Sequence, residues 1–274
     1  MTISSLNFNS DSDSPSESIS DPISAFTSSG SSVITNLRKI RSFVRREGRL
    51  TTSQERALKD LYPIYGVNLD FYLKNNLILN SQNLFKNNQP NHPDNSSRPL
   101  VLEIGFGMGQ SLIQMAKANP DLNYLGIEVH RPGVGHILLE IEKENLTNLK
   151  VLCHDAVEVL EKYIPDDCLE IIQIFFPDPW HKKKHHKRRL IQEDFIKKLI
   201  LKLKASGTIH LATDWENYAE QMLKVLSENK DLKNIYGLNN FAPSQEITGR
   251  PLTKFQKRGE NLGHGVWDLI FKKI

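Results

Sequence analysis

An apolar run passes directly into a glycine-rich turn in the stretch LVLEIGFGMG, residues 100–109. Its first five residues have the length and composition of a buried strand. Glycines then alternate at Gly105, Gly107 and Gly109, which permits positive φ angles and leaves bare backbone for a ligand to approach. The spacing differs from the dinucleotide fingerprint G-x-G-x-x-G, and an acid, Glu103, precedes the glycines. This stretch therefore predicts a strand and a turn that meet a ligand at the carboxyl edge of a sheet.

Strand and helix patterns alternate on the C-terminal side of this stretch. Apolar runs of strand length occur at 100–104, 124–128, 149–153, 169–175, 207–212 and 266–271. Helical patterns separate the first five, as at 111–119, 131–145 and 193–203. Alternation of this kind predicts an α/β fold with a mostly parallel sheet covered by helices on both faces.

Two further predicted strands also end in carboxylates. Glu128 lies 25 residues beyond Glu103 and could accept hydrogen bonds from both ribose hydroxyls of a nucleoside. Asp155 ends the next strand, where it could accept a hydrogen bond from an adenine amino group. One acid at a strand end is commonly just a solvated terminus. Three at consecutive strand ends, beside the glycines, indicate a site for a nucleoside-containing ligand.

The fourth predicted strand leads into Pro177-Asp178-Pro179-Trp180. Two prolines hold Asp178 in an extended turn, because each proline fixes its own φ angle and restricts the residue before it. The run HKKKHHKRR, residues 181–189, follows directly. It is either a solvated basic loop or, beside a nucleoside site, a contact for a polyphosphate backbone. Its histidines do not indicate a metal site, since the interleaved lysines and arginines would repel a dication.

Composition divides the chain of 274 residues into two parts. Residues 1–37 contain four acids and no Lys or Arg, so the remainder carries a formal charge of +7. We expect residues 1–36 to be a disordered Ser-rich acidic tail. We expect 37–274 to be one domain, with a basic extension and linker at 37–99 and a catalytic core at 100–274. The chain has no apolar run of the ~18–20 residues that cross a bilayer and no secretory signal, so we expect a cytoplasmic protein without a membrane partner.

Several motifs together resemble those of the bacterial tRNA (guanine-N7)-methyltransferases. Glu103-x-Gly105-x-Gly107-x-Gly109 is similar to motif I of the class I S-adenosylmethionine (SAM) methyltransferases. The more specific segments are FPDPWHK (176–182), KRRL (187–190), ATDW (212–215), RPLTKF (250–255), RG (258–259) and LGHGVWDL (262–269), with the entry segment RSFVRREGR (41–49). The resemblance runs from about residue 38 to the C-terminus. It implies a Rossmann-like class I methyltransferase fold, SAM as the cofactor and tRNA as the substrate, methylated at N7 of the variable-loop guanosine, position 46.

The resemblance also implies roles for individual residues. It implies that the cofactor is bound by Glu103, Gly105, Gly107, Gly109, Glu128, Asp155 and Asp178. Asp178 is in addition the implied catalytic residue. The implied contacts to the substrate nucleotide are made by Lys182, Asp214, Thr253, Lys254, Phe255 and Gln256. The implied contacts to the rest of the RNA are made by Lys184, Lys187, Arg188 and Arg189. The family commonly has Glu where this chain has Gln256, so an anionic role at that position is not expected here. The resemblance implies neither a metal nor an obligate protein partner.

The chemistry of guanine N7 agrees with this set of residues. N7 carries a free lone pair, so no strong general base is needed, and orientation and charge stabilisation should dominate. Asp178 either orients the guanine through its N–H donors or faces the developing cation. Trp180 either stacks on the base or is a buried platform. Two alternatives stay open: a non-catalytic RNA-binding or scaffold protein, and an exocyclic-amine methyltransferase. The second has Asn/Asp-Pro-Pro-aromatic at this strand end, unlike Pro-Asp-Pro-Trp here.

Overall fold

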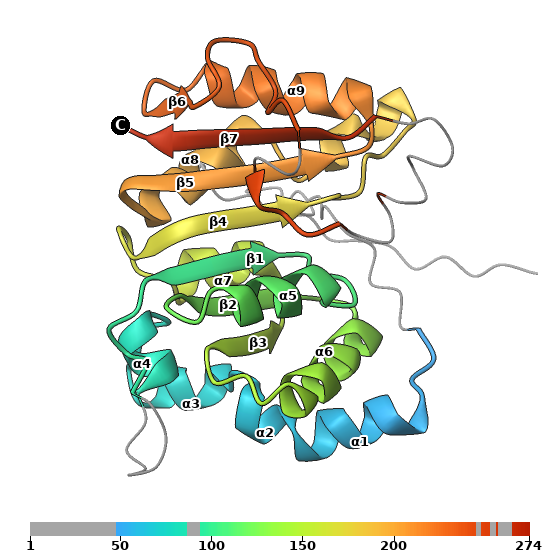
Figure 1. Cartoon of the computed structure of the whole chain (residues 1–274), viewed down its shortest axis with the longest axis vertical. Helices are drawn as coiled ribbons and strands as arrows, with labels where there is room; N and C mark the ends of the chain where they lie inside the picture. Colours follow the sequence, from blue (N-terminus) through green and yellow to red (C-terminus); the bar gives the residue numbers. More distant parts are fainter. Residues whose placement is uncertain (1–47, 87–93, 245–247, 253–255, 257–264) are drawn as a thin grey trace, which may run out of the picture. The chain divides into compact units, whose positions relative to one another are not determined.

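The structure is a computed structural model that describes residues 48–86, 94–244, 248–252, 256 and 265–274 (Figure 1). All of these lie in one compact unit, Ile40–Ile274. The predictions for the tail 1–36, for the basic stretch before Gly48, and for Thr253, Lys254 and Phe255 concern residues outside the described ranges.

A seven-stranded sheet with the order β3-β2-β1-β4-β5-β7-β6 forms the centre of the unit. The strands are β1 (Leu100–Ile104), β2 (Asn123–Glu128), β3 (Leu149–Cys153), β4 (Leu169–Phe175), β5 (Leu203–Thr213), β6 (Leu232–Asn234) and β7 (Trp267–Lys273). Strands β1 to β5 pair in parallel, whereas β7 is antiparallel to both of its neighbours. The predicted mostly parallel sheet is thus confirmed. The short edge strand β6 was not predicted.

Helices cover both faces of the sheet, as predicted, with α5 and α6 in front of it and α7 and α8 behind it in Figure 1. The helices are α1 (Thr52–Asp60), α2 (Tyr62–Tyr65), α3 (Leu69–Lys74), α4 (Ser81–Phe85), α5 (Gln110–Ala118), α6 (Arg131–Lys143), α7 (Ala156–Lys162), α8 (Glu193–Lys202) and α9 (Glu216–Ser227), with a 3₁₀ helix η1 (Lys183–Arg188). Side chains alternate across β1 because successive residues of a strand face opposite sides. Leu100 and Leu102 therefore pack with α7 and α8, while Val101 packs with α5 and α6.

The segment before β1 contains more helix than the sequence suggested. Helix α1 begins with a capping box in which Thr51 and Gln54 exchange side-chain and backbone hydrogen bonds. Residues 75–99, interpreted from their polar composition as a loop, include α4, which buries Leu84 and Phe85. Among the described helices, none is long and apolar enough to cross a membrane.

The strand order places a ligand site between β1 and β4. From β1 the chain continues outward to β2 and β3 on one side, and the later strands β4 and β5 are added on the other. Such a reversal of strand order leaves a crevice at the carboxyl ends of the strands, where α/β proteins bind ligands. The glycine turn after β1 and the Pro-Asp-Pro turn after β4 both lie at this edge.

Candidate functional site

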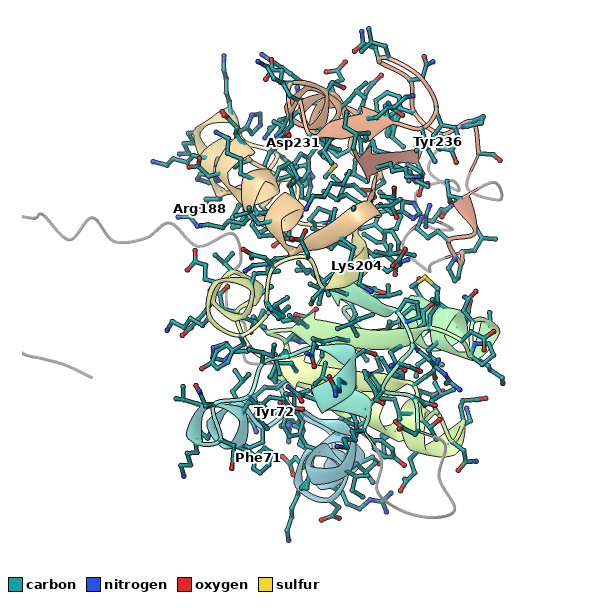
Figure 2. All side chains as sticks on the ribbon, turned by 90° about the vertical axis from the view of Figure 1, so that its left-hand side faces the viewer. Phe71, Tyr72, Arg188, Lys204, Asp231 and Tyr236 are labelled. Carbon is teal, nitrogen blue, oxygen red and sulfur yellow. The ribbon has the colours of Figure 1, made fainter. Side chains whose placement is uncertain are left out.

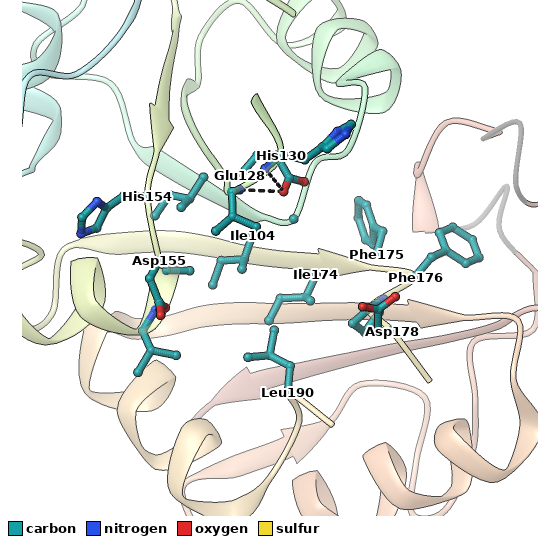
Figure 3. A pocket seen from close by; sticks show the side chains of 16 residues that line it. Ile104, Glu128, His130, His154, Asp155, Ile174, Phe175, Phe176, Asp178 and Leu190 are labelled. Atoms are coloured by element: carbon teal, nitrogen blue, oxygen red, sulfur yellow. Dashed lines mark hydrogen bonds between the residues drawn. The ribbon is translucent and has the colours of Figure 1, made fainter. Parts of the chain in front are cut away.

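A cavity of about 350 Å³ opens at the carboxyl ends of β1 to β4. Figure 3 shows Glu128, Asp155 and Asp178 around it, each from the end of a different strand. The lining residues are Ile104, Gly105, Ile127, Glu128, Val129, His130, His154, Asp155, Ala156, Val157, Ile174, Phe175, Phe176, Pro177, Asp178 and Leu190. The structure therefore brings three of the four predicted acids to one mostly apolar pocket with a few polar groups, as is typical of ligand sites.

The glycine turn meets this cavity with bare backbone. Gly105 and Gly107 have φ angles of 79° and 58°. Among the described residues, apart from each glycine's own chain neighbours, no heavy atom lies within 4 Å of where a side chain would begin. Gly109 differs, because a side chain there would collide with Ile137 of α6. A Cβ on Gly133 would lie 2.0 Å from the carbonyl oxygen of Gly107, so α6 packs directly against the turn. The first two glycines leave space for a ligand and Gly109 allows close helix packing.

Glu128 holds the glycine turn and the start of α6 together. Its Oε2 accepts a hydrogen bond from the Gly107 N–H at 2.8 Å. Its Oε1 accepts hydrogen bonds from the Val129 N–H at 2.7 Å and the His130 N–H at 3.0 Å (Figure 3). A carboxylate has about four lone-pair sites, so acceptor capacity remains for a ligand hydroxyl.

Glu103 lies buried behind the turn and is not among the residues that line the cavity. It is 3% exposed, and within the described part of the chain its Oε2 has no hydrogen-bond partner. Burial, and to a smaller extent the nearby Glu128, together raise the pKa of this carboxyl to about 8. Gln173 is its neighbour in β4, and that side chain also has a buried oxygen without a partner among the described residues. Two unsatisfied buried oxygens close to the turn fit a ligand or water that donates hydrogen bonds.

Asp155 is fixed by the helix that follows it. Its side chain caps α7 by accepting a hydrogen bond from the Val157 N–H at 2.9 Å, and it lines the cavity. The preceding His154 contacts Glu158 at 3.1 Å. His130 and His154 both line the cavity, and neither was predicted from the sequence. The sequence signal that could have identified them is position, since His130 lies two residues beyond β2 and His154 directly follows β3.

Asp178 follows β4 through a constrained turn. Phe176 adopts a left-handed φ of 52°, and its N–H donates to the Ala212 carbonyl oxygen of β5 at 2.8 Å. The Asp178 side chain is exposed and borders the cavity. Trp180 also has a left-handed φ, of 48°, and the Arg188 guanidinium lies 5.1 Å from its ring centroid. One face of Trp180 is thus already covered by a cation.

The basic run forms the 3₁₀ helix η1 beyond this turn, rather than an irregular loop. Lys182, Lys184 and Lys187 are exposed, and Arg188 is half-buried against Trp180 at the margin of the molecule (Figure 2). These four cations are therefore accessible to a polyanion. Asp214 is half-buried and follows β5 at the same edge of the sheet, outside the cavity lining.

Arg189 requires a correction, because the structure does not leave it available for a phosphate. It is 2% exposed, and its guanidinium donates hydrogen bonds to the Pro179 carbonyl at 2.8 Å and to the side chains of Gln221 at 2.6 Å and Asn217 at 3.0 Å. It also lies over the Tyr218 ring, 4.7 Å from the centroid. Arg189 therefore joins the Pro-Asp-Pro turn to α9 and has a structural role in place of the predicted RNA contact.

A buried cluster that the sequence analysis missed lies beside the turn after β4. Arg250 donates two hydrogen bonds to Asp268, both at 2.8 Å, and a third to the Gln256 side-chain oxygen at 2.9 Å. Asp268 also contacts His210 of β5 at 2.8 Å. We call these four residues the Arg250 cluster. Gln256 is thus buried and hydrogen-bonded to an arginine, and the predicted neighbouring contacts Thr253, Lys254 and Phe255 lie outside the described residues.

Comparisons with known proteins show similarity to methyltransferases over most of the chain. A family model described as "Putative methyltransferase" matches residues 97–269. A tRNA (guanine-N(7)-)-methyltransferase of Colwellia psychrerythraea is 51% identical over 237 residues, 86% of this chain and 91% of that protein. One of Aeromonas hydrophila is 52% identical over 238 residues, 87% of this chain and 94% of that protein. Among solved structures, the 16S rRNA methyltransferase KamB superimposes with a TM-score of 0.48 at 14% identity, over 64% of this chain and 87% of that one.

Proposed function

This chain belongs to the tRNA (guanine-N7)-methyltransferase family, and on that premise we propose that it methylates N7 of a guanosine in tRNA, with SAM as the methyl donor. The observation that carries the proposal is the convergence of Glu128, Asp155 and Asp178 on one cavity beside the bare backbone of the glycine turn. We further propose that the methylated guanosine is the variable-loop one at position 46, and that the protein is cytoplasmic.

The residues present fit SAM. Glu128 has acceptor capacity left for the ribose hydroxyls, and Asp155 borders the same cavity, where it can accept a hydrogen bond from the adenine amino group. Gly105 and Gly107 leave room for the methionine part, and its ammonium group suits Glu103 Oε2, which has no hydrogen-bond partner among the described residues. SAM supplies a methyl group on a sulfonium centre when it is bound. The protein therefore has only to hold that group and the guanine in line and to exclude water.

Asp178 is the residue that we assign to the reacting base. Guanine N7 needs no deprotonation, so the carboxylate acts either by accepting hydrogen bonds from the guanine N–H groups or by facing the positive charge that develops on the purine. Both roles require a fixed carboxylate at the mouth of the cavity. The turn supplies this through Pro177, Pro179 and the left-handed Phe176.

The exposed cations beyond Asp178 suit the tRNA backbone. Lys182 is four residues from Asp178 and can contact the nucleotide being methylated. Lys184, Lys187 and Arg188 lie farther from Asp178 in the sequence and can contact phosphates of neighbouring nucleotides in the tRNA. We assign Asp214 and the segment 253–256 to contacts with the same nucleotide, as the family resemblance implies. No second function is favoured by a particular observation.

The decisive experiment is to map 7-methylguanosine in a tRNA transcript incubated with the pure protein and SAM. We expect one modified guanosine at position 46, and no product when that guanosine is replaced by adenosine or when SAM is omitted. Methylation of an exocyclic amine instead would support the second enzyme class. SAM binding that cannot be detected by calorimetry, together with retained tRNA binding, would identify a non-catalytic RNA-binding protein.

A further inference from the structure

The Arg250 cluster contains a buried cation, and burying a cation is unfavourable unless its charge is balanced. The Arg250 side chain is 0% exposed, and its partner Asp268 is 3% exposed. A buried charge is tolerated only when a partner balances it and its hydrogen bonds are satisfied. Here the guanidinium makes two parallel hydrogen bonds to Asp268 and a third to Gln256. This geometry holds the planar group in one orientation.

Within the four residues of the cluster, one cation faces one carboxylate. Arg250 and Asp268 neutralise each other, and Gln256 offers an acceptor oxygen without adding charge. Burial alone would raise the pKa of Asp268, but hydrogen bonds from Arg250 and His210 lower it, so the carboxyl stays ionised. A glutamate at position 256 would put a second carboxylate on the same guanidinium. The amide thus keeps an acceptor oxygen for the guanidinium and adds no second negative charge beside Asp268.

The cluster also contacts the end of β4, which leads to the proposed catalytic residue. The guanidinium carbon lies 5.6 Å from the ring centroid of Phe175 and 5.1 Å from that of Phe176. Phe175 also packs edge-on against His210, at 4.9 Å between ring centroids. Both aromatic rings at this strand end therefore rest on members of the Arg250 cluster.

Phe176 is the residue whose conformation needs such support. A left-handed φ at a non-glycine residue is sparsely populated and persists only where the surroundings impose it. Two interactions impose it here: the N–H bond to the Ala212 carbonyl and the packing of the ring on Arg250. Ala212 is also the partner of Asp268 in the β5–β7 pairing, so both supports depend on the same pair of strands.

We propose that Arg250 is a positioning residue for methyl transfer, whose guanidinium ties β7 to the turn after β4 and thereby fixes the place of Asp178. The exposed Asp178 carboxylate lies only two residues beyond Phe176, so its position follows the backbone of this turn. This inference rests on the proposed function. Arg250 itself is not among the residues that line the cavity, so we assign it no direct contact with the reacting atoms.

The test compares Arg250→Lys and Arg250→Met with a control of the same kind at the other end of the sheet. Asn148 is a suitable control because it is buried and its side chain donates hydrogen bonds to the carbonyls of Ala116, Asn119 and Leu122, just before β3 begins. For each variant, single-turnover methylation is measured with saturating SAM and tRNA, well below its melting temperature. The SAM dissociation constant and the KM for tRNA are measured in parallel.

We expect Arg250→Lys to lower the single-turnover rate by at least about tenfold while the SAM dissociation constant stays within about twofold, because a misplacement of 1 Å can cost about a hundredfold in rate. Lysine keeps the charge but loses the planar group on which Phe176 packs, so it should not rescue the rate lost in Arg250→Met. Asn148→Ala should lower the melting temperature and leave the rate unchanged.

A folded Arg250→Lys protein with the wild-type rate would overturn the inference, and so would an equal loss of rate in Asn148→Ala. If neither Arg250 variant folds, Phe176→Leu removes the ring from the intact cluster and should lower the rate in the same way. A wild-type rate for Phe176→Leu would then also overturn the inference. Absence of methylation by the wild-type protein would instead refute the proposed function, so the two failures are distinguishable.

Discussion

Replacing Glu103 by glutamine should remove a large part of the pH dependence of stability of the unliganded protein. Burial, and secondarily Glu128, raises the pKa of this carboxyl from 4.5 to about 8 in the folded state. Between these pH values the folded protein retains a proton that the unfolded chain releases. The stability connected with this group is therefore complete below pH 4.5 and is lost as the pH rises through about 8.

The size of the effect follows from the same values. Each unit of pKa corresponds to about 1.4 kcal/mol, so ionising Glu103 inside the protein costs at most about 5 kcal/mol. Between pH 6 and pH 9 the free energy of unfolding should fall by about 3 kcal/mol because of this one carboxyl. Glutamine has nearly the same shape and does not ionise, so Glu103→Gln should be the more stable protein at pH 9.

Urea unfolding at pH 6 and pH 9 measures this difference directly. Glu220→Gln is a matched control, since Glu220 is exposed on α9. The control should keep the pH dependence of the wild type, and Glu103→Gln should show a flatter one. If Glu103→Gln loses as much stability as the wild type between the two pH values, Glu103 is ionised in the folded protein and the reasoning from burial is wrong.

The same carboxyl should couple SAM binding to proton release. SAM carries a sulfonium and an ammonium group, and positive charge near Glu103 favours its ionised form. Wild-type affinity for SAM should therefore fall as the pH drops below about 8. Calorimetry in two buffers of different ionisation enthalpy should show a proton released by the wild type and none by Glu103→Gln. Equal proton release by both proteins would place the titrating group elsewhere.

Four further substitutions test the remaining assignments. Glu128→Ala should weaken SAM binding by about 1.5–3 kcal/mol, since charge-assisted hydrogen bonds to the ribose and to the glycine turn are lost together; an unchanged dissociation constant in the folded variant would contradict the ribose contact. Asp178→Ala should lower single-turnover methylation by about 10²–10³-fold with the fold intact, and a loss below tenfold would count against a catalytic role. Removing three exposed or half-exposed cations should flatten the slope of log K for tRNA against log salt by about 2 to 2.7 and spare SAM affinity, whereas a wild-type slope would mean that the run is only solvated. Those three are Lys184, Lys187 and Arg188. Arg189→Ala should instead lower the free energy of unfolding by about 2–4 kcal/mol in a urea titration, and unchanged stability would restore it as an RNA contact.

The sheet could be predicted from sequence because its strands are apolar runs with clear boundaries. The six strands predicted correspond to β1 to β5 and β7, and the convergence of Glu128, Asp155 and Asp178 followed from the rule that parallel strands end at one edge. Strand β6 has three residues, too few for a periodic signal. Helix α4 lies in a polar segment, and its apolar residues are only the last two, Leu84 and Phe85. Two residues are too few to show a helical pattern in the sequence.

The parts of the site that could not be predicted depend on pairings between distant residues. A run of cations does not reveal which member points inward, so Arg189 looked like its neighbours although Gln221 and Asn217 hold it. Arg250 is separated from Asp268 by 18 residues and His210 from Asp268 by 58, and no local pattern predicts these contacts. The departure at Gln256 was visible in the sequence, but its physical meaning appears only with Arg250 as its partner.

The place of β7 has a consequence for how the protein folds as it is synthesised. Strand β7 lies between β5 and β6, so the edge of β5 has no partner until Trp267–Lys273 emerge from the ribosome. At about 5–20 residues per second, the 54 residues from Thr213 to Trp267 take about 3 to 11 s to translate. During that interval β5 offers an unpaired edge to other chains, and unpaired edges promote aggregation. A product that stops before β7 would keep this edge open permanently and would lack Asp268, so quality control by proteases should remove it rather than leave a partly active enzyme.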